Sequence, residues 1–493
     1  MLKEKEFDVF AYLDNHLNNT VYKNEYFNNE NTNQENFVFL KNAENNEENL
    51  KNLQKKYGII FYKGQTRVIE KDNEKDFFMV KFNDFYDLYR NLNEIKKGPK
   101  GANIKINAVN EFFESDNTDK YNDVIFNPNK KESKHTINLF KGLNKNIHKK
   151  LNRIVKDEEV SSFVELINSL SGFDENNSKY FKHWLAHMFQ KMGERPGVNI
   201  FLYGTQGIGK GILMKILRML LEPYYLHLSN DLPFSGQFNS CLANKILIFL
   251  DEAVFSGDVK VANKLKGFTT EDTYMINGKY AMDYNIENFA RIIGASNNEN
   301  IVSVEKGERR NVVFNSSDKY KGSTNKGGFF YELLEFIKDE NNVNLIYNWL
   351  IQRDISDFRV KDIPQTKAMA NVAKLNFKLF DKYLIDVFNG EYEFEVGTFI
   401  DNEKEIRINQ TVFYDEYIKY VKKLKPSNFE SETKTMFTKK LKEIFDFPDN
   451  FNDNWKTKKN DVWVKFYKFD KTDYKQKLAK YLQLSPENIF YKY

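Results

Sequence analysis

The stretch from Asn199 to Leu213, NIFLYGTQGIGKGIL, constrains the fold more than any other part of the chain. An apolar run leads into a glycine-rich turn and then into a helix-forming run, which is the strand, loop and helix order of a phosphate-binding P-loop. Glycines let the backbone turn its N–H groups around phosphate oxygens, and the helix start adds the positive end of its dipole. The stretch therefore predicts an α/β domain that binds a nucleoside triphosphate.

The turn matches the pattern GxxxxGK, and its residues are the candidate ATP ligands. Lys210 adds a point charge for the outer phosphates. Gly211 stands where a Ser or Thr usually supplies a magnesium ligand, so we expect water or another carboxylate to take that position. The predicted ATP-binding residues are Gly204, Gln206, Gly207, Ile208, Gly209, Lys210 and Gly211.

A second motif, KILIFLDEA, follows at Lys245–Ala253. A buried parallel strand explains its apolar run. Burial of the strand does not explain why two carboxylates stand at its carboxyl end, where α/β sheets bind their ligands. The pattern predicts that Asp251 holds Mg²⁺ and that Glu252 orients and polarises the attacking water.

Two further motifs carry candidate catalytic groups. The buried-strand pattern ARIIGASNN ends in polar residues, of which Asn297 is placed to sense the γ-phosphate or its water. The segment GERRNVVF then presents Arg309 and Arg310 just before another apolar strand. One of them is predicted to be an arginine finger that reaches ATP bound by a neighbouring subunit. The pattern does not decide which.

Lysines around a hairpin are candidates for contact with nucleic acid. The dipeptide Asn277-Gly278 predicts a tight turn between two strands. Lys264 and Lys266 precede it and Lys279 lies at its tip, where a mobile cation suits a single-stranded backbone. Solvent-facing lysines explain the same pattern equally well.

Taken in order, GTQGIGKG, ILIFLDEA, LKGFTTED, INGKY, GASNN and ERRNVVF resemble the motifs of superfamily 3 helicases, and more narrowly of the phage, plasmid and poxvirus primase–helicase type. The resemblance implies an AAA+ ATPase core that assembles as a ring, commonly a hexamer. ATP with Mg²⁺ would then lie between subunits and single-stranded DNA in the pore, with movement from 3′ to 5′. It assigns Asn297 as the sensor and Lys279 to the pore hairpin.

The flanking sequence suggests further domains. His183 and His187 share one helical face, but the other parts of a zinc site are missing, which favours structural or surface histidines on an amphipathic helix. The basic turn Lys96–Gly101 favours a solvated loop over phosphate contact. The predicted domains are a polar lead-in (1–56), a small α+β domain (57–150), a helical collar-like segment (151–195), the ATPase core (196–365) and a winged-helix-like domain (370–493).

The winged-helix prediction rests on two helix patterns, Val412–Lys425 and Thr433–Phe445, followed by a strand pattern at Asp461–Phe469. Clustered lysines near aromatics suit backbone contact with DNA, although winged helices also serve as packing modules. The lysines in question are Lys434, Lys439, Lys440 and Lys442 in the second helix and Lys456, Lys458 and Lys459 in the wing.

Composition restricts the classes of protein to which the chain can belong. Lys plus Arg number 74 against 70 for Asp plus Glu, so any nucleic-acid signal has to be local. The single cysteine, Cys241, excludes an internal disulfide and suits a reducing compartment. We find no apolar run of membrane-spanning length and no signal-peptide pattern at the start, which predicts a cytoplasmic protein without a membrane partner.

The leading hypothesis is an ATP-driven, ring-forming DNA helicase for replication of a phage, plasmid or other mobile element, acting on single-stranded or forked DNA. One alternative is an origin-binding initiator or loading platform whose ATP binding orders an assembly. Another is the helicase half of a primase–helicase system with a separate primase or polymerase. No paired-carboxylate motif for nucleotidyl transfer occurs upstream of the P-loop, which argues against priming within this chain.

Overall fold

The computed structural model describes residues 45–71, 79–97, 102–130, 133–229, 232–235, 238–251, 259–277, 283–299, 301–302, 309–394, 399–424, 431–447, 457–459 and 462–490. Glu252, Lys279 and Lys456 therefore lie outside the described residues, as does most of the predicted lead-in. The chain divides into two compact units. Unit 1 comprises Met1–Lys141 and Asn277–Ile286, and unit 2 comprises Gly142–Ile276 and Glu287–Tyr493.

Unit 1 is an α+β structure around a four-stranded sheet of order β3-β2-β1-β6. Strand β1 pairs antiparallel with β2 and parallel with β6. The elements of this unit are α2 (Asn46–Lys56), β1 (Tyr57–Tyr62), β2 (Gln65–Glu70), β3 (Met79–Val80), α3 (Phe82–Tyr89), β4 (Asn93–Lys97), β5 (Asn103–Asn107), α4 (Ala108–Glu114), β6 (Lys120–Tyr121), β7 (Asp123–Ile125) and β8 (Thr136–Asn138).

An aromatic core joins the helices of unit 1 to its sheet. Tyr57 of β1 meets Phe85 of α3 edge to face, with ring centroids 5.0 Å apart, and Phe112 of α4 is buried in the same cluster. Leu53 of α2 is fully buried there as well. Helix α2 covers the last residues of the predicted 1–56 lead-in, so this polar stretch is folded and contributes Leu53 to the core.

Unit 2 is built on a five-stranded sheet of order β10-β11-β14-β9-β15. Every neighbouring pair is parallel. The apolar run of β9 is buried along its whole length, as expected for a strand covered on both faces, and the predicted α/β class is confirmed. The strands are β9 (Asn199–Tyr203), β10 (Tyr225–Leu228), β11 (Leu247–Asp251), β14 (Arg291–Ser296) and β15 (Asn311–Asn315).

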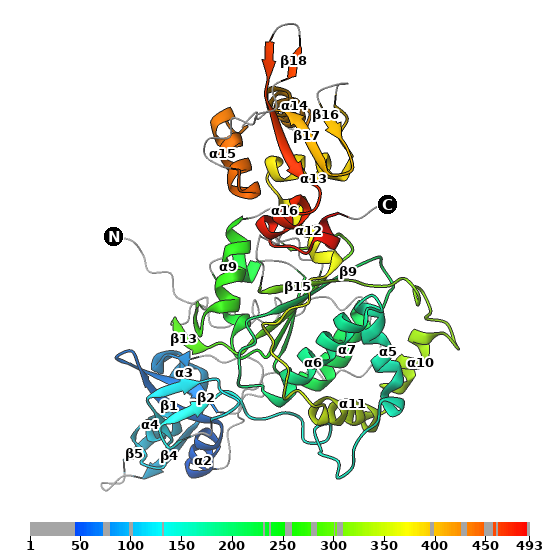
Figure 1. The fold of residues 1–493 in the computed structure, drawn as a ribbon. Coiled ribbons are helices and arrows are strands. Elements are labelled where there is room, and N and C mark those ends of the chain that lie inside the picture. The colour runs from blue at the N-terminus through cyan, green and yellow to red at the C-terminus, as the bar shows by residue number, and fades with distance from the viewer. Residues whose placement is uncertain are drawn as a thin grey trace, which may run out of the picture. The chain divides into compact units, whose positions relative to one another are not determined.

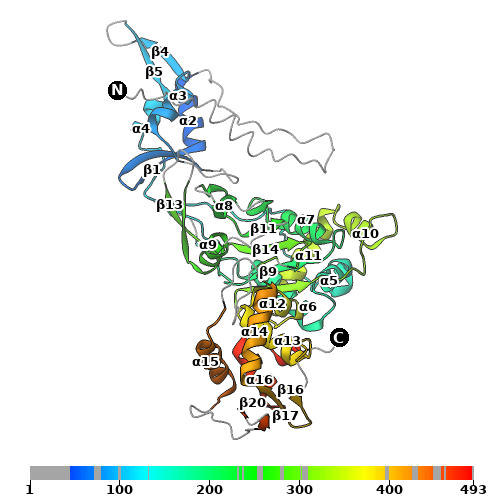
Figure 2. The same ribbon diagram turned by 90° about the horizontal axis from the view of Figure 1, so that it is seen from above.

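Helices cover this sheet on both sides. Figures 1 and 2 show α6, α7 and α11 grouped on one side of the sheet and α9 on the other. The 151–195 segment forms helices that pack into the same unit as the sheet. The helices from η1 to α12 are η1 (Asp157–Val160), α5 (Ser161–Leu170), α6 (Glu175–Gln190), α7 (Lys210–Leu221), α8 (Leu232–Ser235), η2 (Ser240–Leu242), α9 (Val259–Thr270), α10 (Phe329–Phe336), α11 (Glu340–Gln352) and α12 (Lys367–Asn376).

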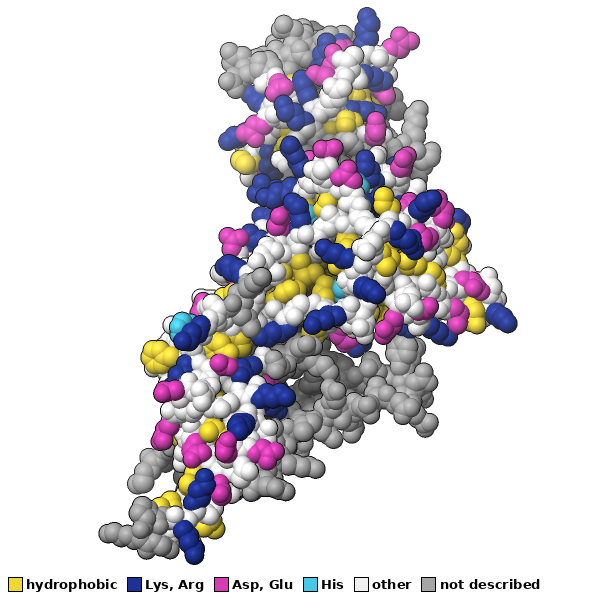
Figure 3. All heavy atoms as spheres, turned by 90° about the horizontal axis from the view of Figure 1, so that it is seen from below, with side chains coloured by type: hydrophobic (Ala, Val, Ile, Leu, Met, Phe, Trp, Pro, Cys, Tyr) yellow, Lys and Arg dark blue, Asp and Glu magenta, His cyan; other side chains and the backbone are white. Residues whose placement is uncertain are grey.

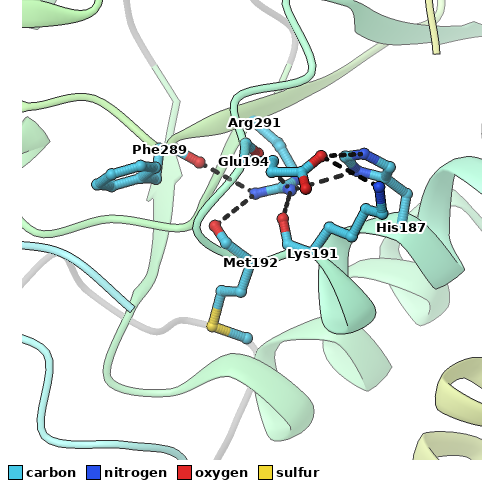
Figure 4. Close-up of polar contacts among 6 residues, drawn as sticks. All are labelled: His187, Lys191, Met192, Glu194, Phe289 and Arg291. Atoms are coloured by element: carbon cyan, nitrogen blue, oxygen red, sulfur yellow. Dashed lines mark hydrogen bonds and ion pairs between the residues drawn. The ribbon is translucent and has the colours of Figure 1, made fainter. Parts of the chain in front are cut away.

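Arg291, the first residue of β14, ties the end of α6 to the sheet (Figure 4). It is 1% exposed, and its guanidinium donates to the backbone oxygens of Lys191 and Glu194, both at 2.9 Å, and of Phe289 at 3.1 Å. A cation at this position satisfies carbonyls at the carboxyl end of the helix and complements its dipole. Burial lowers the pKa of Arg291 to about 9, so it remains charged near neutral pH.

His187 lies in the same cluster and is buried (Figure 4). Burial, with a smaller contribution from the Arg291 charge, lowers its pKa to about 4. The Glu194 carboxylate lies 3.7 Å from Nε2 of His187 but is more than half exposed. Its charge therefore affects the pKa of His187 less than burial does. His183, one turn earlier, meets the ring of Phe358 with centroids 5.4 Å apart. Both histidines pack among neighbouring residues in unit 2.

The C-terminal part of unit 2 combines helices with a three-stranded antiparallel sheet of order β16-β17-β20. Phe413, Tyr417 and Phe437 form its aromatic core. Both predicted helices are present, whereas the single strand predicted at Asp461–Phe469 is divided into β19, which pairs with β18, and β20, which pairs with β17. The elements are α13 (Leu379–Asn389), β16 (Phe399–Asp401), β17 (Glu405–Asn409), α14 (Gln410–Leu424), α15 (Lys434–Phe445), β18 (Thr457–Lys459), β19 (Val462–Val464), β20 (Phe466–Asp470), α16 (Tyr474–Leu482) and α17 (Pro486–Ile489).

None of the helices in the described part of the chain combines the length and the apolar character that a membrane crossing requires. On the face drawn in Figure 3, Lys and Arg side chains are interspersed with Asp and Glu. This pattern agrees with the near balance of charge in the sequence.

Candidate nucleotide-binding site

The glycine-rich turn joins the end of β9 to the start of α7, and three of its glycines have backbone angles that other residues rarely adopt. Gly204, Gly207 and Gly209 have φ values of 151°, 83° and 99°. A Cβ at Gly209 would also lie 2.6 Å from a ring carbon of Phe330. The turn thus depends on glycine for both conformation and space, and helix α7 begins directly after it at Lys210.

Lys210 brings the turn and the end of β14 together. Its Nζ donates to the backbone oxygens of Gly204 at 2.6 Å and Ser296 at 2.9 Å, and to Oδ1 of Asn297 at 3.0 Å. Strand β14 is the direct neighbour of β9, with Ser296 paired to Tyr203. The sheet therefore places the lysine and the predicted sensor within hydrogen-bonding distance, although 86 positions separate Ser296 from Lys210 in sequence.

Asp251 lies at the same edge of the sheet, at the end of β11. Its register partner in β14 is Ala295, two residues before Asn297. One strand separates β11 from β9, which sets their spacing at about 10 Å. The Asp251 side chain is 45% exposed. These positions put Asp251 across β14 from the glycine-rich turn, at the carboxyl ends of the strands, where parallel α/β sheets usually bind their ligands.

His227 is a neighbour of Asp251 that the sequence analysis missed. Its Nε2 lies 3.3 Å from Oδ2 of Asp251, and it belongs to β10, which pairs in parallel with β11. Its ring also meets Phe249 with centroids 5.0 Å apart. The available signal was a histidine near the end of a short apolar strand, YYLHL, between the two motifs. Only the strand order shows that this strand adjoins β11.

A second missed feature is the segment after β15, which runs along the glycine-rich turn. Thr205 Oγ1 donates to Oδ1 of Asp318 at 2.6 Å, and Gly322 N donates to the backbone oxygen of Gly207 at 3.1 Å. Ser316 N donates to the Tyr203 oxygen at 2.8 Å. The segment SSDKYKG has no phosphate-binding signature in sequence, so its position comes from the parallel pairing of β15 with β9.

Gly211 differs from the other glycines of the turn. Its φ is not in the left-handed range, and a Cβ built there would have no heavy atom within 4 Å apart from its immediate surroundings in the chain. The missing hydroxyl is thus not explained by lack of space. Among the described residues no group of three or more His, Cys, Asp or Glu is arranged to hold a metal ion. The carboxylate of Asp251 suits Mg²⁺, which usually takes one or two carboxylates together with phosphate oxygens.

Arg309 and Arg310 lie at the opposite edge of the sheet. Asn311, the next residue, pairs with Asn199 at the start of β9, whereas the glycine-rich turn follows the end of that strand. The length of β9 separates the two edges by about 16 Å. Arg310 is partly buried beside a small cavity that Asn199 also lines, and Arg309 is exposed. Neither arginine is placed to reach the glycine-rich turn of the same chain.

The predicted nucleic-acid lysines do not form one group in the described residues. Lys264 is exposed on α9, while Lys266 lines the same small cavity as Arg310. Residues two apart on a helix point in different directions, so the two lysines do not form a row along a strand of DNA. Strands β12 (Thr273–Ile276) and β13 (Tyr284–Glu287) pair with each other as predicted, but residues 277–283 separate them, which is more than a tight turn at Asn277-Gly278 requires. Lys279 lies outside the described residues.

Comparison with known proteins gives three findings. Residues 202–310 match a family model described as a family of unknown function, DUF5906. The DNA primase-polymerase of Nitratiruptor phage NrS-1 is 33% identical over 184 residues, which cover 36% of this chain and 24% of that protein. The chain thus matches about a quarter of that relative's length.

Solved structures of the NrS-1 C-terminal region share the fold. One apo structure has a TM-score of 0.56 at 19% identity, and a second has 0.58 at 21%. Both matches cover 84% of this chain and 97% of the other. The likeness therefore extends well beyond residues 202–310, and at this identity it concerns the fold alone.

Proposed function

We propose that this protein is an ATP-hydrolysing, ring-forming helicase of phage DNA replication, with an AAA+ core and a C-terminal winged helix. One observation carries the proposal: Lys210 and Asn297 are hydrogen-bonded at the carboxyl edge of a parallel sheet whose next strand ends in Asp251. Similarity to a phage primase-polymerase supports the replication role. The protein would act in the cytoplasm of the infected cell.

In this proposal the glycine-rich turn holds the phosphates of ATP through its backbone N–H groups, and Lys210 exchanges its carbonyl and amide partners for phosphate oxygens. Asp251 would hold Mg²⁺, which neutralises charge that develops on the phosphates. Glu252, the next residue in sequence, would orient the attacking water as a general base. Asn297, beside the lysine, would sense the terminal phosphate by a hydrogen bond. Loss of the phosphate would then change the position of the end of β14.

The arginines support a shared site. Because β15 starts at the edge opposite the turn, Arg309 or Arg310 would act on ATP held by a neighbouring copy, as an arginine finger in trans. A ring, commonly a hexamer, gives every subunit such a neighbour. Each hydrolysis step would then move the β12–β13 hairpin, with Lys279, along one DNA strand from 3′ to 5′.

A second candidate function is the helicase half of a primase–helicase system. It is favoured by the NrS-1 comparison, in which the structural match is to the C-terminal region of a primase-polymerase. Priming would then come from a separate polypeptide or domain. A loading platform that assembles with ATP but does not unwind DNA is distinguished from both by the absence of strand separation.

The test is the variant Lys210→Ala, with Lys215→Ala as a matched control on the exposed side of the same helix. Loss of the phosphate-binding ammonium should reduce ATP hydrolysis and forked-DNA unwinding by at least about 100-fold, whereas the control should keep both. Hydrolysis is measured as phosphate release and unwinding as separation of a labelled strand. Retention of most turnover in Lys210→Ala would remove the ATPase proposal, and hydrolysis without unwinding in the parent protein would favour the platform.

A further inference from the structure

Strands β4 and β5 form a two-stranded ribbon that is firmly held at one end. At its base, Asn107 Nδ2 donates to Oδ1 of Asn93 at 2.9 Å, and Oδ1 of Asn107 accepts from the N–H of Val109 at the start of α4. Glu94 accepts from the N–H of Asn46 in α2 at 3.0 Å. Figure 2 shows the ribbon projecting from the helices of unit 1. The ribbon therefore has a fixed direction relative to the core of unit 1.

The far half of the ribbon is open to solvent on both faces. Ile95 is 68% exposed and Ile104 is 46% exposed. The pairing places Ile95 opposite Lys105 and Ile104 opposite Lys96. Paired residues share a face of a ribbon, so each face carries one exposed isoleucine beside one exposed lysine. Lys97, also exposed, adds a further positive charge close to the turn.

The exposed aliphatic and lysine side chains of the ribbon suit a surface that binds a partner. A two-stranded hairpin is marginally stable in water by itself, and aliphatic side chains on both of its faces gain nothing from exposure. Glu94, the one acidic residue in the two strands, sits at the base, where it accepts from Asn46 and lies 3.5 Å from Lys96. The outer half is therefore positively charged and apolar together.

We infer that the β4–β5 ribbon binds duplex DNA, with its lysines on the phosphates and the isoleucine of the inserted face in the major groove. A two-stranded ribbon fits the major groove, where apolar side chains contact the thymine methyl group. Lysines gain binding energy at phosphates through counterion release. They are depleted at protein–protein interfaces, which disfavours a protein partner. Single-stranded DNA is disfavoured too, because it is usually held on aromatic side chains.

The ribbon belongs to unit 1 and contains none of the residues proposed for ATP hydrolysis. Its role thus extends the proposed function: a duplex-binding element would hold the part of a fork that is not yet separated. The ribbon proposal does not depend on ATP hydrolysis, and duplex binding can be measured without ATP. Failure of the ATPase proposal would leave the ribbon proposal standing, and the reverse is also true.

The first experiment removes the charges. Lys96, Lys97 and Lys105 are changed together to Gln in the full chain, and the control changes Lys55, Lys81 and Lys120, three exposed lysines elsewhere in unit 1, in the same way. Binding to a blunt duplex is measured by fluorescence anisotropy over a series of salt concentrations. The ribbon variant should lose about tenfold or more in affinity, and its plot of log K against log salt should be shallower by about 2 to 3.

The second experiment removes the apolar contacts. Ile95→Thr combined with Ile104→Thr keeps β-branched residues in the strands, and should weaken duplex binding about threefold to tenfold with an unchanged salt slope. Binding to single-stranded DNA should change little in either variant. Equal behaviour of the ribbon and control lysine variants would overturn the inference. An equal loss for duplex and single strand would overturn it too, because the surface would then be a general basic patch.

Discussion

The two edges of the central sheet carry different sets of polar side chains. At the carboxyl edge, Lys210, Asn297 and Asp251 come from three strands or their following turns and lie close together. At the amino edge, Arg291 is buried against backbone carbonyls and Arg310 lies beside a small cavity. Parallel strands explain the contrast, because all their carboxyl ends point the same way. Residues that follow strands are thus gathered into one site, and residues that precede strands are kept away from it.

The sharpest test of this contrast concerns the amino-edge arginines. Arg309→Ala and Arg310→Ala are made singly, and one of them should lower ATP hydrolysis by about 1000-fold, the lower end of the effect of an arginine finger. Mixing that variant with Lys210→Ala should restore part of the activity, since a mixed ring contains interfaces with an intact lysine and an intact arginine. Hydrolysis is measured as phosphate release over a range of mixing ratios.

The matched control is each variant assayed alone at the same total protein concentration. Each should stay inactive. If both arginine variants hydrolyse ATP at the parent rate, the amino edge takes no part in catalysis. If one is inactive but mixing restores nothing, the arginine does not act across an interface.

Arg291 offers a second test, because it lies at the amino edge but is buried. Arg291→Met should lower the free energy of unfolding by about 3 kcal/mol, since several buried carbonyls lose their donor while the cost of burying the charge is relieved. Urea unfolding monitored by circular dichroism measures the change. The control Arg218→Met removes a half-exposed ion pair with Glu222 and should cost no more than about 1 kcal/mol.

Below its unfolding temperature the Arg291→Met protein should hydrolyse ATP at nearly the parent rate. Loss of hydrolysis with unchanged stability would place Arg291 in the chemistry, and the distinction between the two edges would then fail.

The smallest effect is expected at the carboxyl edge, at Gly211. Gly211→Ser introduces a hydroxyl where the backbone and the surrounding space accept a side chain. The variant should lower the Mg²⁺ concentration that gives half-maximal hydrolysis about threefold, because a further oxygen ligand becomes available. Gly211→Ala is the control for the change in helix propensity alone. An identical Mg²⁺ dependence in all three proteins would show that the hydroxyl position is not part of the metal shell.

Much of the architecture was predictable from local patterns. The apolar runs at Asn199, Lys245 and Ala290 predict buried strands, and the structure contains β9, β11 and β14 there. The helix pair and strand of the C-terminal region were predicted in the same way. The α2 helix was missed because NEENLKNLQKK is polar, with Leu53 as one of its few core contacts. The segment does carry local helix signals, because the Asn45 side chain accepts from Glu48 N at the helix start and Lys55 and Lys56 lie in the last turn.

The amino-acid sequence alone determined the glycine-rich turn, because a left-handed backbone and a lysine at fixed spacing are local properties of the chain. It also determined which stretches become buried strands. Only the tertiary structure decided that His227 and Asp318 adjoin the site, and that the arginine pair lies at the opposite end of β9 from the glycine-rich turn. Strand order and strand direction decide these contacts, and both depend on which strands pair across long separations, a property that no single segment encodes.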